Sequence, residues 1–258
     1  MELNDCFDCA LRGDNKCGYD YVLVREMMND EVKEARRGEI HVTDLTGCLL
    51  KAYLDKVSPA PEYIHETLAR WLGTNFHSAA EGSDALLDSE LPLEWNGIVG
   101  KSDVVYKDGR IVDFKFTRWM YVNKLPYGSH ATQVNIYAWM LRKMGRKVTR
   151  LQIQYVDASG PTKCRKCRIP VRAVIDDNGG MELKCPKCGN FVTSAHLGAY
   201  LVDIPLWTDE EVESLILERK ENLEAALAMN LPPTMEPGFL CAYCSHRDLE
   251  CFPDVTEE

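Results

Sequence analysis

Two carboxylates and one amine lie on either side of a predicted tight turn: Asp103, Asp113 and Lys115. Alternating apolar residues before and after this turn predict a β-hairpin. If the loop holds only two residues, the side chain of Asp103 faces away from Asp113. If it holds residues 107–109, with Gly109 in the left-handed conformation, the two carboxylates lie opposite each other and share a face with Lys115.

Two adjacent carboxylates repel each other unless a hard divalent cation lies between them. Phosphodiester hydrolysis requires such a cation, and a neighbouring lysine can orient the attacking water and stabilise the charge of the transition state. The pattern Asp-x-Lys alone is also common on solvated strand faces with alternating charges. The hairpin therefore predicts a nuclease site only where other residues support it.

Two predicted helices carry further residues at helical spacing. Gly73, His77 and Glu81 share one stripe, where the glycine permits close backbone approach and the histidine offers an imidazole ligand. Gln133 and Tyr137 are one turn apart on a later helix. Taken alone, a histidine on a helix is more often packed or capped than a ligand, and a Gln/Tyr pair is usually surface plus core.

In this order, the motifs Gly-x3-His-x3-Glu, Gly-x2-Asp, Asp-x-Lys and Gln-x3-Tyr resemble the RecB-type branch of the PD-(D/E)XK nuclease superfamily. The resemblance implies an α/β core, with a mixed central sheet flanked by helices. It implies that His77, Asp103 and Asp113 bind Mn²⁺ or Mg²⁺, helped by a backbone carbonyl near Phe114. It also implies catalytic roles for Lys115, Gln133, Tyr137 and Glu81, with Gln133 and Tyr137 contacting DNA or ordering the site. One departure is Asp113, where family members often have Glu.

The chain has 11 cysteines, most of them in C-x2-C pairs, a spacing suited to metal binding from one tight turn. A C-terminal trio leaves a tetrahedral site one ligand short, and Cys48 is the solitary upstream cysteine. This arrangement resembles iron–sulfur nucleases, among them the CRISPR-associated RecB-like exonuclease family. The resemblance implies a [4Fe–4S] cluster that joins the N-terminal helix to the C-terminal tail through Cys48, Cys241, Cys244 and Cys251. A structural zinc ion with the same ligands is the alternative.

A second group of cysteines has the spacing of a two-knuckle zinc ribbon: Cys164, Cys167, Cys185 and Cys188. Basic residues lie inside or beside each knuckle: Arg165, Lys166, Arg168, Lys184 and Lys187. The ribbon either touches DNA or a partner protein, or only stabilises an insertion. Such a ribbon is not part of the usual pattern of the CRISPR-associated family.

Three N-terminal cysteines remain: Cys6, Cys9 and Cys17. They are a possible third metal site, completed by His41 or another histidine. One of them could instead replace Cys48 in the cluster, or all three could be free thiols. The sequence leaves these alternatives open.

The composition limits the class of protein. With 45% hydrophobic and 27% charged residues the chain can bury a sizeable core, and a net charge of −10 restricts any nucleic-acid surface to a local groove. The acidic N-terminus and the lack of an apolar run of about 20 residues predict neither a signal peptide nor contact with a membrane. We therefore expect a reducing, intracellular location, the cytoplasm, which would be that of the host cell if the protein is viral.

Secondary structure follows from periodicity, caps and turns. We expect a small irregular cap over residues 1–40, followed by a nuclease domain over residues 41–160 and 191–258 that is interrupted by the ribbon over residues 161–190. One helix is predicted from an N-cap at Thr43 or Asp44 to a point before Pro59, and a second over 62–80. A third is predicted from an N-cap at Ser129 to a stop at Gly145, and a fourth from the capping box of Thr208 and Glu211 to Met229. Strands are predicted around the hairpin, where Val104, Val112, Phe114 and Phe116 form the core face, and over 150–157 and 199–204.

These features predict a metal-dependent DNA exonuclease. The resemblance implies action on single-stranded ends, in the 5′ to 3′ direction, in one of two settings. One is CRISPR prespacer processing beside the integrase proteins, and the other is viral or recombinational end resection beside recombination proteins. The alternative is a catalytically silent scaffold that binds DNA or a partner through its ribbon and cluster.

Overall fold

The structure is a computed structural model that describes most of the chain. The described residues are 3–12, 20–28, 38–60, 67–68, 71, 86–117, 125–157, 162–175, 181–192, 198–236, 238, 241 and 244–246. Most of the helix predicted over 62–80, including His77, lies outside them, as do Glu81, Cys17 and Cys251. The chain divides into two compact units, one of Met1–Ala79, Pro92–Gly100 and Trp207–Glu258, the other of Ala80–Leu91 and Lys101–Leu206.

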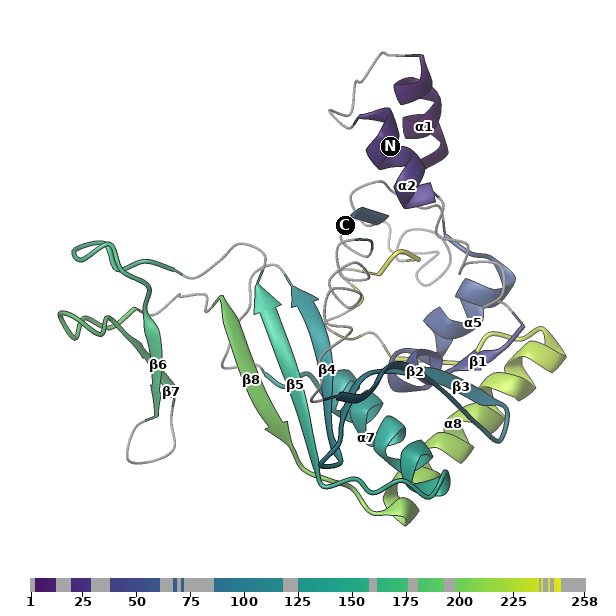
Figure 1. The fold of residues 1–258 in the computed structure, drawn as a ribbon. Coiled ribbons are helices and arrows are strands. Elements are labelled where there is room, and N and C mark those ends of the chain that lie inside the picture. The colour runs from purple at the N-terminus through teal and green to yellow at the C-terminus, as the bar shows by residue number, and fades with distance from the viewer. Residues whose placement is uncertain are drawn as a thin grey trace. The chain divides into compact units, whose positions relative to one another are not determined.

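The second unit is built on a mixed sheet. Strand β3 (Ile98–Tyr106), which enters this unit at Lys101, pairs antiparallel with β4 (Arg110–Thr117), and β2 (Leu86–Trp95) also pairs with β3. Strand β5 (Arg150–Asp157) runs parallel to β4, and β8 (Ala199–Ile204) antiparallel to β5. Helix α7 (Gly128–Lys143) packs on β4 and β5 (Figure 1). The predicted bounds of β5 and β8 are confirmed.

The β3–β4 turn has the predicted three-residue loop. Val104 pairs with Val112 and Val105 with Ile111, which leaves residues 107–109 as the loop. Gly109 has φ +88° and donates its N–H to the carbonyl of Tyr106 at 2.9 Å. This register places Asp103 and Asp113 at the next position along the hairpin, as one of the two alternatives predicted.

The two faces of this hairpin are buried differently from the prediction. Val104 and Val112 are buried, but Phe114 and Phe116, which were expected beside them in the core, are only half-buried. The opposite face, which carries Asp113, is the one that α7 covers, and its apolar residues are fully buried: Ile111, Leu151 and Ile153. The carboxylate therefore lies in the interior.

Helix α7 begins and ends close to its predicted limits. Its N-cap is Tyr127, without a side-chain hydrogen bond, so the predicted cap Ser129 lies inside the first turn instead. The helix ends at Lys143, and Gly145 follows with φ +78°, as the prediction of a glycine stop required. Every residue from Gln133 to Leu141 is buried.

The cysteine-rich insertion between β5 and β8 forms a small sheet of its own. Strands β6 (Arg172–Ile175) and β7 (Met181–Lys184) pair antiparallel. A short cluster of buried and half-buried residues packs around Cys164, Val171 and Cys185. The insertion is therefore a separate module within the second unit.

The first unit begins with two helices, so the prediction of an irregular cap is wrong. Helix α1 (Leu3–Leu11) packs against α2 (Tyr21–Met28), with the rings of Phe7 and Tyr21 5.5 Å apart. Apolar residues on both helices supply the contact, and Val24 and Met27 are fully buried. Strand β1 (Ile40–His41) then pairs parallel with the start of β3.

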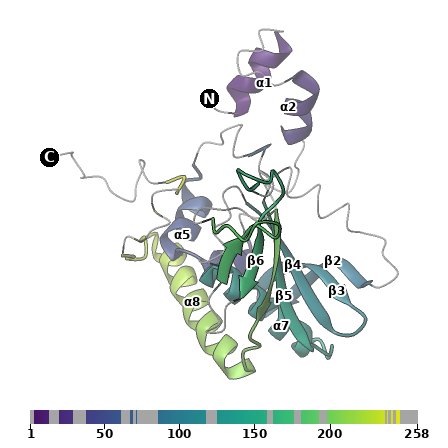
Figure 2. The same cartoon turned by 90° about the vertical axis from the view of Figure 1, so that its left-hand side faces the viewer.

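The single helix predicted after Thr43 is two helices. Helix α4 (Val42–Thr46), whose N-cap is His41 and not Thr43 or Asp44, ends at Gly47, and α5 (Leu49–Val57) begins after Cys48. Helix α8 (Asp209–Met229) packs beside α5 (Figure 2) and starts with the predicted capping box of Thr208 and Glu211. Among the described helices, none is long and apolar enough to cross a membrane.

We predict that Gly109→Ala destabilises the second unit more than Gly145→Ala does. Both glycines have positive φ, but a Cβ at Gly109 would lie 2.7 Å from the carbonyl oxygen of Lys147. A Cβ at Gly145 would have no neighbouring atom within 4 Å. The shared backbone cost is about 1 kcal/mol, and the clash adds about 1–3 kcal/mol at Gly109 only. Urea unfolding of both variants measures the difference, and equal losses would contradict the close approach of Gly109 to the carbonyl of Lys147.

Candidate active site

Lys115 lies at the centre of a polar group on the α7 side of the sheet. Its ammonium is 2.9 Å from the carboxylate of Asp113, the preceding residue on the same face of β4, and donates to Gln133 Oε1 at 2.9 Å. Asp113 is 1% exposed and the side chain of Lys115 is 21% exposed. The pair therefore combines a buried acid with a base that solvent can reach.

Gln133 continues the contact from β4 onto the helix. Since its Oε1 accepts from Lys115, its Nε2 is the donor to Tyr137 Oη, at 2.8 Å. Both side chains are buried. The predicted partners Asp113, Lys115, Gln133 and Tyr137 are thus joined in one chain of contacts.

Asp103 joins this site from β3. Its Oδ2 accepts the backbone N–H of Phe114 at 2.7 Å. That N–H therefore bonds to a side chain, one position beyond the pair of Val104 and Val112. The carboxylate of Asp103 is therefore held against the backbone of β4.

The pKa of Tyr137 depends on both acids. Burial raises the pKa of its phenol well above the ordinary value, and the charges of Asp113 and Asp103 raise it further, against a hydrogen bond from Gln133. A raised pKa keeps the phenol neutral at physiological pH. The influence of both carboxylates on one phenol places them in the same neighbourhood.

The donor set fits a hard divalent cation. Asp103 and Asp113 present carboxylate oxygens, which Mg²⁺ and Mn²⁺ prefer, from adjacent strands at one level of the hairpin. A lysine is already present to balance part of their charge. The remaining predicted members, His77 and Glu81, lie outside the described residues.

Three residues that the sequence reasoning missed lie beside Lys115. Tyr155 pairs with Lys115 across β4 and β5, and its hydroxyl is 3.0 Å from His130 Nδ1 and accepts the N–H of Tyr127 at 3.3 Å. Burial lowers the pKa of His130 to about 4, and the charge of Lys115 contributes. His130, Gln133 and Tyr137 are spaced i, i+3 and i+7, so helical periodicity could have found the histidine.

The four ribbon cysteines form a second candidate site. The Sγ atoms of Cys164, Cys167, Cys185 and Cys188 all lie within 4.8 Å of one another. Cys164 Sγ and Cys188 Sγ are 3.7 Å apart. A tetrahedral ion with Zn–S bonds of about 2.3 Å would separate its sulfurs by about 3.8 Å. The predicted group is therefore brought together, with room for a single metal ion.

The two knuckles have the same local structure. The backbone carbonyl of Cys164 accepts the N–H of Arg168 at 2.8 Å, and the carbonyl of Cys185 accepts that of Gly189 at 2.9 Å. Arg168 and Gly189 both have positive φ. Burial acts to raise the pKa of the Cys185 thiol, but backbone N–H groups of Cys188 and Lys187 lower it more, and the pKa falls to about 6. Cys185 therefore favours the thiolate, the form that binds metal, whereas a hydrogen bond with Cys188 and burial raise the pKa of the Cys167 thiol to about 12.

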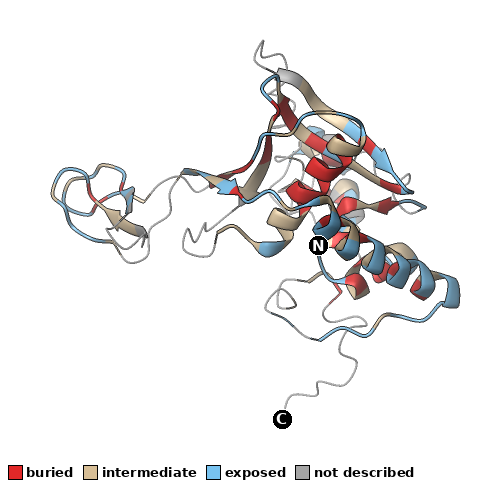
Figure 3. Ribbon diagram, turned by 90° about the horizontal axis from the view of Figure 1, so that it is seen from below, coloured by how far each residue is buried: buried red, intermediate tan, exposed pale blue. Residues whose placement is uncertain are grey.

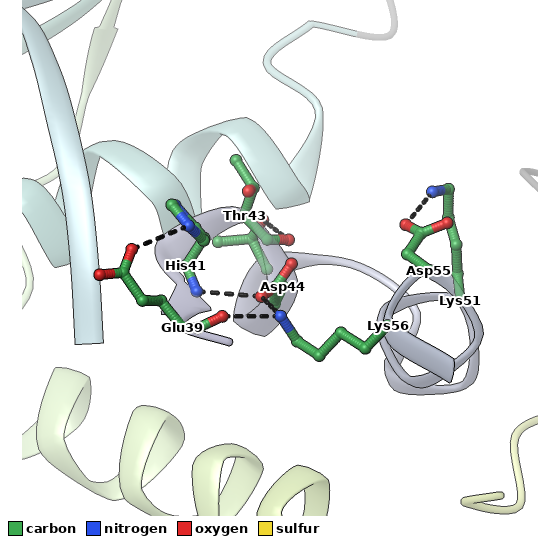
Figure 4. A network of polar contacts seen from close by, with 8 residues as sticks. Glu39, His41, Thr43, Asp44, Lys51, Asp55 and Lys56 are labelled. Carbon is green, nitrogen blue, oxygen red and sulfur yellow. Dashed lines mark hydrogen bonds and ion pairs between the residues drawn. The ribbon is translucent and has the colours of Figure 1, made fainter. Parts of the chain in front are cut away.

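Cys48 lies at the junction of α4 and α5, which polar contacts hold in place (Figure 4). Lys56 on α5 pairs with Asp44 on α4 at 2.9 Å and donates to the carbonyl of Glu39 at 2.7 Å. Arg219 of α8 donates to the carbonyls of Leu45 and Gly47. The position of Cys48 is thus fixed from both sides of the helix break.

The C-terminal cysteines lie on a segment that contacts α5. Gly238 donates its N–H to Cys241 Sγ at 3.3 Å, and Cys244 follows in the next turn. His246 Nε2 is 2.7 Å from Asp55, two helical turns after Cys48 on the same face of α5. Three of the four predicted cluster ligands, Cys48, Cys241 and Cys244, therefore belong to one compact unit, and Cys251 lies outside the described residues.

The N-terminal cysteines stay unassigned. Cys6 and Cys9 are three residues apart on α1, and Cys9 is buried. Within the described part of the chain, the ribbon cysteines are the only group close enough to share one ion. Cys17 lies outside that part.

Comparison with known proteins gives weak likenesses. No family model matches the sequence, and no curated protein matches it. Among solved structures, the chain is similar to the protein SSO0001, with 16% identity, a TM-score of 0.44 and coverage of 81% of this chain and 83% of that one. It is similar to an alkaline exonuclease from Laribacter hongkongensis, with 10% identity, a TM-score of 0.44 and coverage of 78% and 96%. It is also similar to a phage related exonuclease from Haemophilus somnus 129PT, with 14% identity, a TM-score of 0.35 and coverage of 74% of this chain and 92% of that one. No family follows from these values, so the side chains of this protein must indicate its function.

We predict that His130 makes the protein less stable as the pH falls from 6.5 towards 4. Its pKa is lowered from 6.5 to about 4 by burial and Lys115, so between these values the unfolded chain binds a proton that the native state does not. The contribution of His130 to the free energy of unfolding is fully present above pH 6.5. Below that pH it decreases by at most about 1.4 kcal/mol per pH unit. Urea unfolding of wild type and His130→Gln at several pH values measures the term, and parallel pH profiles would contradict it.

Proposed function

We propose that this protein is a nuclease that uses Mn²⁺ or Mg²⁺ to hydrolyse phosphodiester bonds of DNA. The observation that carries the proposal is the chain of contacts from Asp113 through Lys115 and Gln133 to Tyr137, with Asp103 at the neighbouring position of the hairpin. A solvated strand face would leave these charges exposed, but Asp113 is 1% exposed. Burial of a charged acid costs several kcal/mol, which favours a functional reason for its presence.

Asp103 and Asp113 would hold the metal ion, with His77 as the third ligand. The ion would supply Lewis acidity and a lowered pKa for a bound water molecule. The two carboxylates come from adjacent strands of one hairpin, so their separation is set by the sheet and not by flexible loops. A rigid frame of this kind suits a metal with strict geometry.

Lys115 would act on the attacking water and on the phosphate. The hydrogen bond to Gln133 uses one of the three N–H donors of its ammonium, and the ion pair with Asp113 holds the ammonium beside the carboxylate. Another N–H of the ammonium can orient a water molecule or donate to a phosphate oxygen as negative charge develops there. Its partly exposed side chain gives the substrate access.

Gln133 and Tyr137 would position Lys115. The Gln133 amide accepts from the lysine and donates to the phenol, so each group fixes the orientation of the next. A neutral Tyr137, ensured by its raised pKa, keeps a hydroxyl beside the carboxylates without adding negative charge.

For the cysteines we propose a zinc ion in the ribbon and a [4Fe–4S] cluster on Cys48, Cys241, Cys244 and Cys251. The spacing of the ribbon sulfurs supports a single tetrahedral ion. The contact of the C-terminal segment with α5 supports the cluster, since it brings the tail to the helix that Cys48 precedes. Thiolate-bound metals also favour a reducing, intracellular compartment.

We further propose that the substrate is single-stranded DNA, degraded from its ends, in CRISPR prespacer processing or in viral or recombinational resection. The resemblance of the ordered motifs supports this choice.

We predict that Asp113→Asn and Lys115→Ala each lower the rate of DNA hydrolysis about a hundred-fold or more, because each removes a group that the transition state needs. End-labelled single-stranded DNA with Mn²⁺ measures the rate. Asp203→Asn is the matched control for the acid, since Asp203 of β8 is exposed and pairs with Arg150 of β5. Lys147→Ala, an exposed lysine before β5, is the control for the base.

Both controls should keep the wild-type rate. A wild-type protein that binds DNA without cutting it, with or without metal, would establish the scaffold alternative and refute the nuclease. A closed single-stranded circle cut as fast as a linear strand would refute the preference for ends.

We predict that anaerobically purified protein is brown, with a broad absorption band at about 400 nm from thiolate-to-iron charge transfer. Cys48→Ser should lose most of this band and its iron. Cys167→Ser should lose zinc but keep the band, because Cys167 belongs to the ribbon. A colourless wild-type protein that contains only zinc would show that Cys48, Cys241, Cys244 and Cys251 bind zinc and not an iron–sulfur cluster.

A further inference from the structure

The ribbon differs in charge from the rest of the protein. Residues 162–192 contain seven Lys and Arg against three Asp and Glu, a formal charge of +4, in a chain whose net charge is −10. Four thiolates and one Zn²⁺ would subtract two charges, and the module would stay positive. A positive module on an acidic protein is a feature that metal binding alone does not require.

Six of the seven cations are exposed: Lys163, Arg165, Lys166, Arg168, Arg172 and Lys187. Within the described residues none of these six forms an ion pair, whereas the seventh, Lys184, pairs with Glu182 at 2.6 Å. Figure 3 shows the insertion, at the left, largely in the colours of exposed and intermediate residues. Arg165 and Lys166 lie in the first knuckle and Lys187 in the second, so both knuckles carry positive charge outward.

An exposed aromatic ring accompanies these cations. Phe191 is 63% exposed, and Lys184 Nζ is 4.4 Å from the centroid of its ring. Lys184 and Phe191 are bridge partners at the base of the second knuckle. A phenyl ring beside cations is the combination with which proteins bind single strands, since bases stack on the ring while phosphates meet the charges.

The tether of the ribbon starts beside the active site. Asp157, the last residue of β5, donates its N–H to the carbonyl of Gly198 at 2.9 Å, so the chain leaves and re-enters the sheet at one point. Lys115 pairs with Tyr155, two residues before that point. Only residues 158–161 separate Asp157 from Thr162, which limits the distance between these two residues to about 18 Å in any orientation of the module.

We propose that the ribbon is a second DNA-binding surface, which holds the single strand a few nucleotides from the bond that the active site cuts. Arg165, Lys166 and Lys187 bind its phosphates, and Phe191 stacks on a base. This inference rests on the proposed function for the identity of the substrate. It extends that function because the ribbon would bind only strands long enough to reach it, while the residues on the sheet would perform the reaction.

The test compares two double variants in the full-length protein with Asp113→Asn, which prevents cleavage. Arg165→Ala/Lys187→Ala removes one cation from each knuckle. Lys107→Ala/Lys147→Ala removes two exposed lysines of the same unit, which precede β4 and β5 and so lie at the end of these strands away from the tether. Fluorescence anisotropy measures binding of labelled single strands of about 4 and about 30 nucleotides, and zinc content verifies that the ribbon is intact.

We expect the ribbon variant to bind the long strand about ten-fold or more weakly at 0.1 M salt, with a salt dependence of log K reduced by about 1.4, because two phosphate contacts are lost. Binding of the short strand, which the active site alone can hold, should not change. Phe191→Ala should weaken the long strand about five-fold or more, and a blunt duplex of equal length should not respond to it. The control variant should bind as the parent does.

Unchanged binding of the long strand by the intact ribbon variant would overturn the proposal and leave an acidic protein as the partner that fits the charges. Equal losses for both strand lengths would also overturn it. Neither result depends on cleavage. A protein that binds as expected but cuts no DNA would refute the proposed nuclease and leave the ribbon surface standing.

Discussion

The site depends on the contact between Asp113 and Lys115. A carboxylate that is 1% exposed costs several kcal/mol to keep charged unless a cation and hydrogen bonds balance it. The ammonium 2.9 Å away provides that balance, and it also fixes which end of the Gln133 amide faces the sheet. Because the other end then donates to Tyr137, one ion pair sets the orientation of side chains on both β4 and α7.

Helix α7 explains why these polar groups stay in place. Its residues from Gln133 to Leu141 are buried on every side, so the helix lacks the polar face of a surface helix and cannot rotate without exposing apolar side chains. Asn135 adds a polar anchor, since it donates to the carbonyls of Ala131 and Pro205 at 3.0 and 3.1 Å. Gln133 and Tyr137 are therefore presented by a rigid element, as a precise site requires.

Local features could be predicted from the sequence because local physics decides them. The left-handed Gly109 fixed the loop length and hence the register of Asp103 and Asp113, and the capping box of Thr208 fixed the start of α8. The pairing of Tyr155 with Lys115 could not be predicted, since the register of parallel strands joined by a helix has no local cause. The break before Cys48 was missed for a similar reason, because Arg219, far along the chain, binds the carbonyls there.

The separation of the basic module from the acidic hairpin has a physical advantage. DNA carries a negative charge at every phosphate, so two carboxylates repel it unless cations lie nearby. Additional lysines beside Asp103 and Asp113 would attract the strand, but they would also pair with the carboxylates and compete with a divalent ion for them. Lys115 is the one such cation whose contact with these acids the described residues show. Cations placed on a tethered insertion can attract the strand while the carboxylates keep their oxygens for the metal.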